Sequence, residues 1–270
     1  MTDDGGAERP GYFVQSVARV MDVLKAFDAG HPVRTSADVA KETSLDRAAA
    51  RRFLLTLADL GYVRNDDGQF SLRPRVLDLG FAYLSSLSLP EIVQPHIEAL
   101  VSEVHETSSV GVIDSGEVVF VARAATQSLR AMPVMVGSRF HVYASSMGHV
   151  LLAGAAAEDR ERYLEHVEMR RLTENTITTR AELERRLTQV REQGYAVSDR
   201  EGDGVTTSMA VPLRAPDGAT VAAINLSIVA DGTSAIRVRS LLPALQRTAS
   251  AIESDLAAKR GTVPLAVSWT

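Results

Sequence analysis

The apolar positions at the start of the chain predict three short helices followed by a hairpin. Spacings of three and four residues predict helices over residues 16–29, 36–42 and 46–61. Residues 62–72 then form two short β runs around Asn-Asp-Asp-Gly, in which Asp-Gly is a strong hairpin signal. This succession of helices, with a tight turn before the third and a hairpin after it, predicts a winged helix-turn-helix.

Polar residues with capping chemistry stand at the expected helix starts. Ser36 precedes the second apolar run and is interpreted as its N-cap. Ser44 lies in the tight turn at residues 43–45, and Asp46 is placed to cap the third helix, which Gly61 ends.

Beyond residue 90 the pattern alternates between short β runs and longer amphipathic runs. The expected strands cover residues 110–114, 118–122, 129–136, 195–198, 208–213 and 221–229. The expected helices cover residues 90–106, 145–153, 156–167, 180–193 and 234–258. Because turns join most of these strands and the helices come in blocks, the pattern predicts an α+β domain with an antiparallel sheet flanked by helices.

These elements predict two domains and a connecting helix. The predicted order is a disordered tail, the winged helix-turn-helix, a linker helix, a larger second domain and a second tail, at residues 1–11, 12–73, 74–89, 90–260 and 261–270. The linker helix is apolar on more than one side, which predicts packing against a second copy of the chain. A homodimer, or a tetramer, would also let the module reach two DNA half-sites ~34 Å apart.

Composition narrows the class of protein. The 270 residues suit two domains, and no apolar run approaches the ~18 residues of a membrane span, so we expect a cytoplasmic protein without membrane contact. The absence of cysteine excludes disulfides, thiolate zinc sites and iron–sulfur clusters, and we expect no cofactor. The net charge is −5, yet residues 11–75 hold ten Lys/Arg against eight Asp/Glu, so only the first domain is mildly basic.

The third helix carries a cluster of arginines opposite its apolar stripe. Arg51 and Arg52 lie on the face away from that stripe, with Arg47 at its edge, and Ala48 and Ala49 between them allow close approach to a surface. Such a helix fits the ~12 Å major groove of DNA. The alternative is an ordinary solvated helix face.

The remaining candidate DNA contacts surround this helix. Arg64 and Gln69 on the hairpin are placed to touch the backbone or the minor groove, and Asp46 would accept a hydrogen bond from a cytosine amino group, although its charge opposes phosphate. The complete set of candidate contacts to double-stranded DNA is Ser36, Ser44, Asp46, Arg47, Arg51, Arg52, Arg64 and Gln69.

A second candidate site lies in the larger domain. Ser145, Ser146 and Met147 stand where a helix begins, and the free N–H groups of a helix N-terminus favour a carboxylate. On the β runs, Ser208, Asn225 and Ser227 offer neutral hydrogen-bond partners. Simpler interpretations stay open, because Ser145 suits a plain N-cap and polar residues on an edge strand face water.

Several stretches resemble the IclR family of bacterial transcriptional regulators. The resemblance covers residues 12–259 and is carried by FVQSVARVMDVLKAFDAG, LDRAAARRFLLTLADLGYV, FSLRPRVLDLGFAYLSS, VGSRFHVYASSMGHVLLAG and SMAVPLRAPDG. The second and third stretches are similar to the PcaR, PcaU and PobR subgroup, whose members control the breakdown of protocatechuate, 4-hydroxybenzoate and related aromatic acids.

The resemblance implies a GAF-like effector-binding domain over residues 90–260 that binds a small organic acid, aromatic or keto. The pocket residues it implies are Leu129, Met132, Ser145, Ser146, Met147, Asp199, Ser208, Asn225 and Ser227. The chain departs from the family pattern in the loop DREGDGVTTS (residues 199–208), and it has His141 and His149 where proline and arginine are usual. The departures leave the identity of the acid open.

Enzymatic alternatives have little support in the sequence. Ser145 and His149 share a helix face at i and i+4, but no G-x-S-x-G elbow, glycine-rich phosphate loop or histidine ligand spacing is present. Arg185-Arg186 is interpreted as a solvated helix face. We therefore expect a ligand-responsive DNA-binding regulator and no enzyme. The alternative is a small-molecule-binding or hydrolytic protein whose N-terminal module makes protein contacts.

Overall fold

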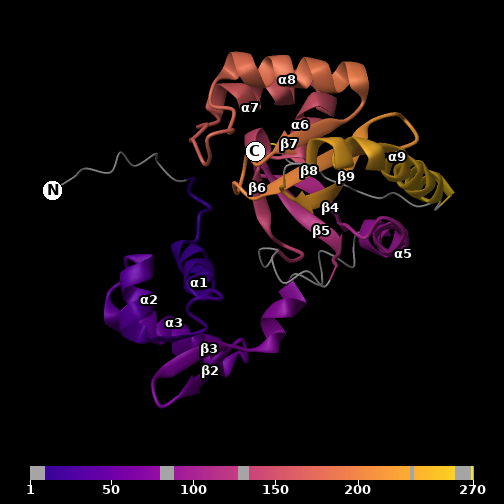
Figure 1. Cartoon of the computed structure of the whole chain (residues 1–270). Helices are drawn as coiled ribbons and strands as arrows, with labels where there is room; N and C mark the ends of the chain where they lie inside the picture. Colours follow the sequence, from indigo (N-terminus) through magenta and orange to yellow (C-terminus); the bar gives the residue numbers. More distant parts are fainter. Residues whose placement is uncertain (1–9, 80–87, 127–133, 232–233, 259–268, 270) are drawn as a thin grey trace. The chain divides into compact units, whose positions relative to one another are not determined.

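The computed structural model describes residues 10–79, 88–126, 134–231, 234–258 and 269. The chain divides into two compact units, residues 1–83 and 84–270 (Figure 1). Both units mix helices with antiparallel sheet, as the sequence predicts.

The N-terminal unit is a winged helix-turn-helix. Its helices are α1 (Gln15–Lys25), α2 (Ser36–Thr43) and α3 (Arg47–Asp59), and its strands are β1 (Val33–Thr35), β2 (Val63–Asp66) and β3 (Gln69–Leu72). The order β1-β3-β2 makes the predicted hairpin part of a three-stranded antiparallel sheet. No pattern in the sequence predicted β1, because three residues are too few to show an alternation.

Side-chain caps begin both α2 and α3. The N-cap of α2 is Thr35, whose hydroxyl accepts from the Asp38 backbone N–H while the Asp38 carboxylate accepts from the Thr35 N–H. The prediction that Ser36 is this cap was therefore wrong by one residue. Asp46 caps α3 as predicted, accepting from the Ala49 N–H at 2.8 Å, and Ser44 adopts the left-handed conformation that closes the turn.

A small apolar core fixes α3 against the rest of the N-terminal unit. Leu54 and Leu57 of α3 are buried against Val23 of α1, Val39 of α2 and Phe70 of β3. Leu60, which lies within the predicted third helix, directly follows the last residue of α3 and is 52 % exposed. The core therefore orients the opposite, arginine-bearing face of α3 toward solvent.

The C-terminal unit is built on one antiparallel sheet of six strands in the order β6-β5-β4-β9-β8-β7. The strands are β4 (Thr107–Asp114), β5 (Glu117–Ala124), β6 (Arg139–His141), β7 (Ala196–Asp199), β8 (Thr206–Arg214) and β9 (Thr220–Val229). The helices are α5 (Ser88–Val104), α6 (Ser146–Gly154), α7 (Ala157–His166), α8 (Arg180–Gln193) and α9 (Ser234–Ala258), with short 3-10 turns at Pro74–Val76 and Val142–Ala144.

Two helical layers cover the two faces of this sheet (Figure 1). One core cluster packs α5 and α9 against Val110, Met209 and Leu226. The second packs α6, α7 and α8 against the opposite face, where Ala210 and Ala223 present small side chains. Side chains alternate between faces along a strand, so the face under α6 takes every second residue of β4, β8 and β9.

Some sequence expectations fall outside the described residues or differ from the structure. The strand expected at residues 129–136 lies largely outside them, and residues 134–136 are not β; the strand at this edge is β6 instead. The tails and most of the linker helix also lie outside, although residues 77–79 are helical. At the C-terminal end, Trp269 packs edge-on against Tyr163, with 5.9 Å between ring centroids, so the expected loose tail is anchored there.

No helix in the described parts of the chain is long and apolar enough to cross a membrane.

Candidate DNA-binding and effector sites

The exposed face of α3 carries the predicted arginine cluster. Arg47, Arg51 and Arg52 are all exposed, and within the described residues none has a carboxylate at ion-pair distance. Ala48 is exposed between them, whereas Ala49 is buried with its N–H bonded to Asp46, so only one of the two alanines shapes this face. The result is a solvated row of three cations on a rigid helix.

The wing bears a weaker positive charge than the sequence suggested. Arg64 and Gln69 are exposed, but Nε of Arg64 lies 2.7 Å from a carboxylate oxygen of Asp66, which offsets its charge. The wing turn itself is ordered, because the Gly68 N–H donates to Asn65 Oδ1 and both Asp67 and Gly68 have positive φ. Ser44 is exposed beside α3, whereas Ser36 is buried and offers no open surface.

A row of polar side chains crosses the sheet on the face covered by α6. Ser109 of β4 pairs in register with Arg123 of β5 and with Asn225 of β9, so the three side chains share one face. Arg123 Nη1 donates to Ser109 Oγ at 3.2 Å, and Asn225 Oδ1 accepts from the Ser109 N–H at 3.0 Å.

The row continues toward α6. Asn225 Nδ2 donates to Ser227 Oγ at 3.1 Å, and Ser227 pairs with Ser208 of β8. Ser208 in turn shares a hydrogen bond of 2.8 Å with Ser146, the first residue of α6. Four of the predicted pocket residues therefore form one continuous polar strip across the sheet.

The start of α6 is tightly packed. Ser145 is its N-cap and accepts from the Gly148 N–H at 3.1 Å, which is the simpler of the two roles considered for it. Met147 is buried and touches Gly111 of β4. A Cβ at Gly148 would overlap the Val142 carbonyl, so this glycine allows the helix to approach the preceding turn closely. The predicted residues Leu129 and Met132 lie outside the described residues.

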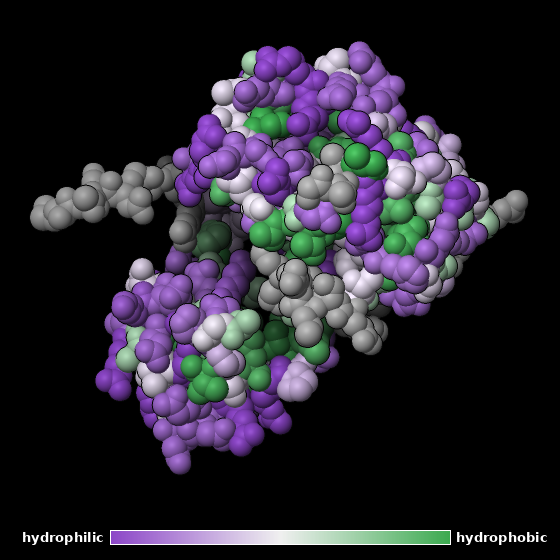
Figure 2. Space-filling model, in the orientation of Figure 1, coloured by the Kyte–Doolittle hydropathy of each residue, from purple (hydrophilic) through white to green (hydrophobic). Residues whose placement is uncertain are grey.

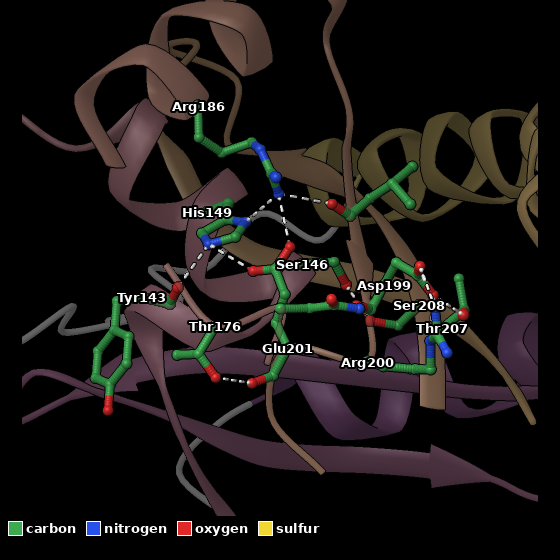
Figure 3. A network of polar contacts seen from close by, with 12 residues as sticks. Tyr143, Ser146, His149, Thr176, Arg186, Asp199, Arg200, Glu201, Thr207 and Ser208 are labelled. Atoms are coloured by element: carbon green, nitrogen blue, oxygen red, sulfur yellow. Dashed lines mark hydrogen bonds and ion pairs between the residues drawn. The ribbon is translucent and has the colours of Figure 1, made fainter. Parts of the chain in front are cut away.

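The loop after β7 is held by a buried network that sequence reasoning missed (Figure 3). Glu201 Oε1 accepts from Arg186 Nη1 of α8 at 2.9 Å, and the same nitrogen donates to the Val197 carbonyl at 2.9 Å. Side chains of residues 173–176 donate to three successive loop carbonyls at 2.7 to 2.9 Å, those of Asp199, Arg200 and Glu201. The interpretation of Arg186 as a solvated residue was therefore wrong.

His149 completes this network from α6. Its side chain is fully buried, and Nε2 donates to the Tyr143 carbonyl at 2.9 Å, which leaves Nδ1 as the acceptor facing Arg186. Burial, assisted by Arg186, lowers the pKa of His149 to about 4, so the ring is neutral near pH 7. Burial raises the pKa of Glu201, and the charge of Arg186 opposes this rise.

Asp199, another predicted pocket residue, is already partnered. Its carboxylate accepts from Thr207 Oγ1 at 2.7 Å and pairs with the Arg200 guanidinium at 3.2 Å. Hydrogen bonds from Arg200 and Thr207 lower the pKa of Asp199. Asp199 pairs in register with Thr207, so its side chain lies on the opposite face of the sheet from Ser208 and is not part of the polar row.

Arg123, Glu201 and Arg186 are the functional candidates that the sequence did not reveal. Arg123 directly follows the predicted β run of residues 118–122, all of them apolar, and nothing in that pattern shows which face of the sheet the cation takes. The Glu201–Arg186 pair joins residues fifteen positions apart through tertiary contact alone. No spacing pattern in the sequence predicts a pair of this kind.

The geometry gives no support to a hydrolase built on Ser145 and His149. The Ser145 hydroxyl serves as a helix cap and His149 Nε2 faces a backbone carbonyl, so no side-chain hydrogen bond between the two is described. The hollows on the outer surfaces of α7 and α8 are shallow, and each is lined by residues of a single helix. The fold and sites thus define a protein with a winged helix-turn-helix and a separate sheet domain that carries an internal polar site.

Comparison with known proteins agrees with this class. Residues 16–67 match the IclR helix-turn-helix domain, and residues 81–254 match the C-terminal domain of the bacterial transcriptional regulator IclR. The chain therefore belongs to the IclR family of transcriptional regulators and has an effector-binding C-terminal domain. This confirms the resemblance noted in the sequence.

Three relatives illustrate the similarity. The Pca regulon regulatory protein of Pseudomonas putida is 35 % identical over 216 residues, which cover 80 % of this chain and 74 % of the relative. A putative transcriptional regulator from Rhodococcus is 46 % identical with a TM-score of 0.81, covering 91 % and 99 % of the two chains. An IclR homologue from Microbacterium hydrocarbonoxydans, solved with 4-hydroxybenzoate, is 29 % identical with a TM-score of 0.77, covering 90 % and 99 %.

Proposed function

We propose that two copies of the chain bind a near-palindromic DNA operator through α3 and that a small organic acid bound in the C-terminal domain changes operator binding. The observation that carries the DNA contact is the unpaired cationic row of Arg47, Arg51 and Arg52 on a helix whose other face is buried. The N-terminal turns of such a helix reach base edges, and its guanidiniums reach guanine or phosphate.

An apolar strip on α1 supports pairing of two copies. Val14, Val17 and Met21 lie three to four residues apart and are 57 %, 60 % and 43 % exposed. Leu77 and Leu79, at the start of the linker, are also exposed. Most of the surface visible in Figure 2 is hydrophilic, so a contiguous apolar strip on the smaller unit is the feature expected of an interface.

The polar row under α6 supports the proposal that the C-terminal unit binds an effector. Its hydrogen-bonding groups lie on a sheet face whose other side chains are apolar, among them Phe120, Ala210 and Ala223, which is the composition of a site for a small polar molecule. A homologue in the same family was solved with 4-hydroxybenzoate, and on that basis we extend the subgroup expectation of an aromatic acid to this chain. The acid would act by binding more tightly to one arrangement of the dimer than to another. The resulting change in operator binding can be no larger than that difference in affinity.

A salt titration tests the DNA contact. A duplex selected by the full-length chain from a random pool is titrated by fluorescence anisotropy at ~50 to 200 mM salt. We expect affinity to fall steeply with salt, and the Arg51→Ala/Arg52→Ala double variant to weaken binding at least ~10-fold and to flatten the slope. Arg185→Ala, an exposed arginine of α8, is the matched control and should bind as the parent does. An unchanged slope in the double variant would overturn the proposal.

A further inference from the structure

Arg123 is a cation on the sheet face covered by α6, with no counter-charge among the described residues. Its side chain is half-buried beside Ser109, which is itself almost completely buried. The only described hydrogen bond of its guanidinium is the one to the neutral Ser109 hydroxyl, and no carboxylate of the described residues lies within ion-pair distance. Five N–H donors are therefore held on this face with one acceptor used.

Such an arrangement is costly unless an anion completes it. Removing a guanidinium from water without an opposite charge is unfavourable, and burial lowers the pKa of Arg123 without any group that compensates. The other arginines near the polar row are already satisfied, because Arg186 is bound to Glu201 and Arg200 to Asp199. Arg123 differs from Arg186 and Arg200 because it has no carboxylate partner among the described residues.

We propose that Arg123 binds the carboxylate of the effector and that this one guanidinium makes the site selective for monocarboxylic acids. This assignment rests on the proposed effector function. The fork of a guanidinium matches both oxygens of a carboxylate, which gives orientation as well as affinity. Ser109 and Asn225 follow on the next two strands, at spacings of ~4.8 Å, so they would meet a polar group further along the same molecule.

This placement differs from the one that the sequence suggested. The N-terminus of α6 has Ser145 as its cap and Ser146 bonded to Ser208, so its nearest side chains are already engaged. Because Arg123 is the one cation of the described part of the site that is not already paired with a carboxylate, a second carboxylate on the ligand would have no counter-charge there. We therefore expect aromatic monoacids to bind better than the dicarboxylate β-ketoadipate.

Ligand binding to the full-length chain tests the assignment. Titration calorimetry measures the binding of four acids: benzoate, 4-hydroxybenzoate, protocatechuate and β-ketoadipate. It compares them with 4-hydroxybenzamide, the neutral analogue of 4-hydroxybenzoate. We expect the parent chain to bind at least one monoacid and to bind the amide ~10-fold or more weakly. Arg123→Gln should weaken the acid ~10- to 100-fold and abolish the preference for acid over amide, and Arg123→Lys should be intermediate.

The controls separate this assignment from the effector proposal. Arg185→Gln, a change on the outer face of α8, should leave acid binding unchanged. If no acid binds the parent chain, both the acid effector and the role of Arg123 are wrong. If the acids bind but the amide binds equally well, or if folded Arg123→Gln binds them as tightly, only the role of Arg123 is wrong. The amide comparison uses the unmodified chain, so it decides the question even where a variant does not fold.

Discussion

Arginines of the two units lie in opposite surroundings. On α3, Arg51 and Arg52 stand in water without a described carboxylate partner, whereas Arg186 on α8 is wedged between Glu201, the Val197 carbonyl and His149. An exposed guanidinium keeps its hydration until a phosphate replaces it, so it adds little to folding. The enclosed guanidinium of Arg186 makes its hydrogen bonds within the fold. Its removal would leave the buried Glu201 carboxylate without a charge partner.

The largest expected effect comes from removing the enclosed cation. Arg186→Met keeps much of the side-chain volume but leaves the Glu201 carboxylate without its charge partner, and Glu201 Oε2 already lacks a hydrogen bond within the described residues. Breaking a buried pair in this way costs about 3–5 kcal/mol, and Arg186 is partly exposed, so we expect the lower end. Urea unfolding at pH 7.5 measures the change.

A double variant shows whether the charge is the cause. Arg186→Met combined with Glu201→Gln removes both charges, and we expect it to recover at least half of the stability that Arg186→Met loses. If the two variants are equally unstable, packing of the Arg186 stem explains the loss and the contrast between the two kinds of arginine fails.

The second effect is a pH dependence that belongs to the enclosed network. His149 is neutral in the fold with a pKa of about 4, against 6.5 for an ordinary histidine. Between these values the unfolded chain binds a proton that the folded chain does not, so this residue stabilises the fold above about pH 6.5 and the contribution is lost as pH falls. From pH 7.5 to 5.5 we expect a loss of about 1 kcal/mol.

The variant His149→Gln isolates this contribution, because its amide can still donate to the Tyr143 carbonyl. Subtracting its unfolding free energy from that of the parent at each pH removes the titration of other groups. Glu201 acts in the opposite direction, since its raised pKa favours the protonated form in the fold as pH falls. A difference that does not change with pH would show that His149 is not desolvated.

The N-terminal unit was the easier of the two to predict from sequence. The signals of its helices, caps and hairpin are local, so Asp46 and the Asp67-Gly68 turn were found where the structure has them. The exceptions were small and equally local. The capping box at Thr35 competes with the neighbouring Ser36, and β1 exists only because β3 is beside it.

The polar row of the C-terminal unit could be anticipated only in part, because the contacts among its residues depend on strand register. The bounds of α8 and α9 follow from helical periodicity and were correct. Ser208, Asn225 and Ser227 are adjacent only because β8 and β9 pair as they do, and the family resemblance supplied them. Arg123 and Glu201 depend on strand order and a loop path, which no periodicity encodes.

A third, smaller effect tests the cap of the DNA-facing helix. Asp46→Ala removes the acceptor for the Ala49 N–H and should lower the unfolding free energy by about 1 kcal/mol. Asp46→Asn keeps a capping side chain and removes the negative charge, so it should fold like the parent and bind duplex DNA more tightly at low salt. Weaker binding by folded Asp46→Asn would instead indicate that the carboxylate itself contacts a base.

The smallest expected effect is the most direct test of the comparison. Arg51→Ala/Arg52→Ala should leave the unfolding free energy within about 0.5 kcal/mol of the parent, because both side chains are exposed and alanine favours the helix. The same variant is expected to lose DNA affinity, whereas Arg186→Met loses stability. Urea unfolding of the two variants side by side measures the contrast. A marked destabilisation of the α3 double variant would mean that its arginines hold the fold together and are not free for phosphate.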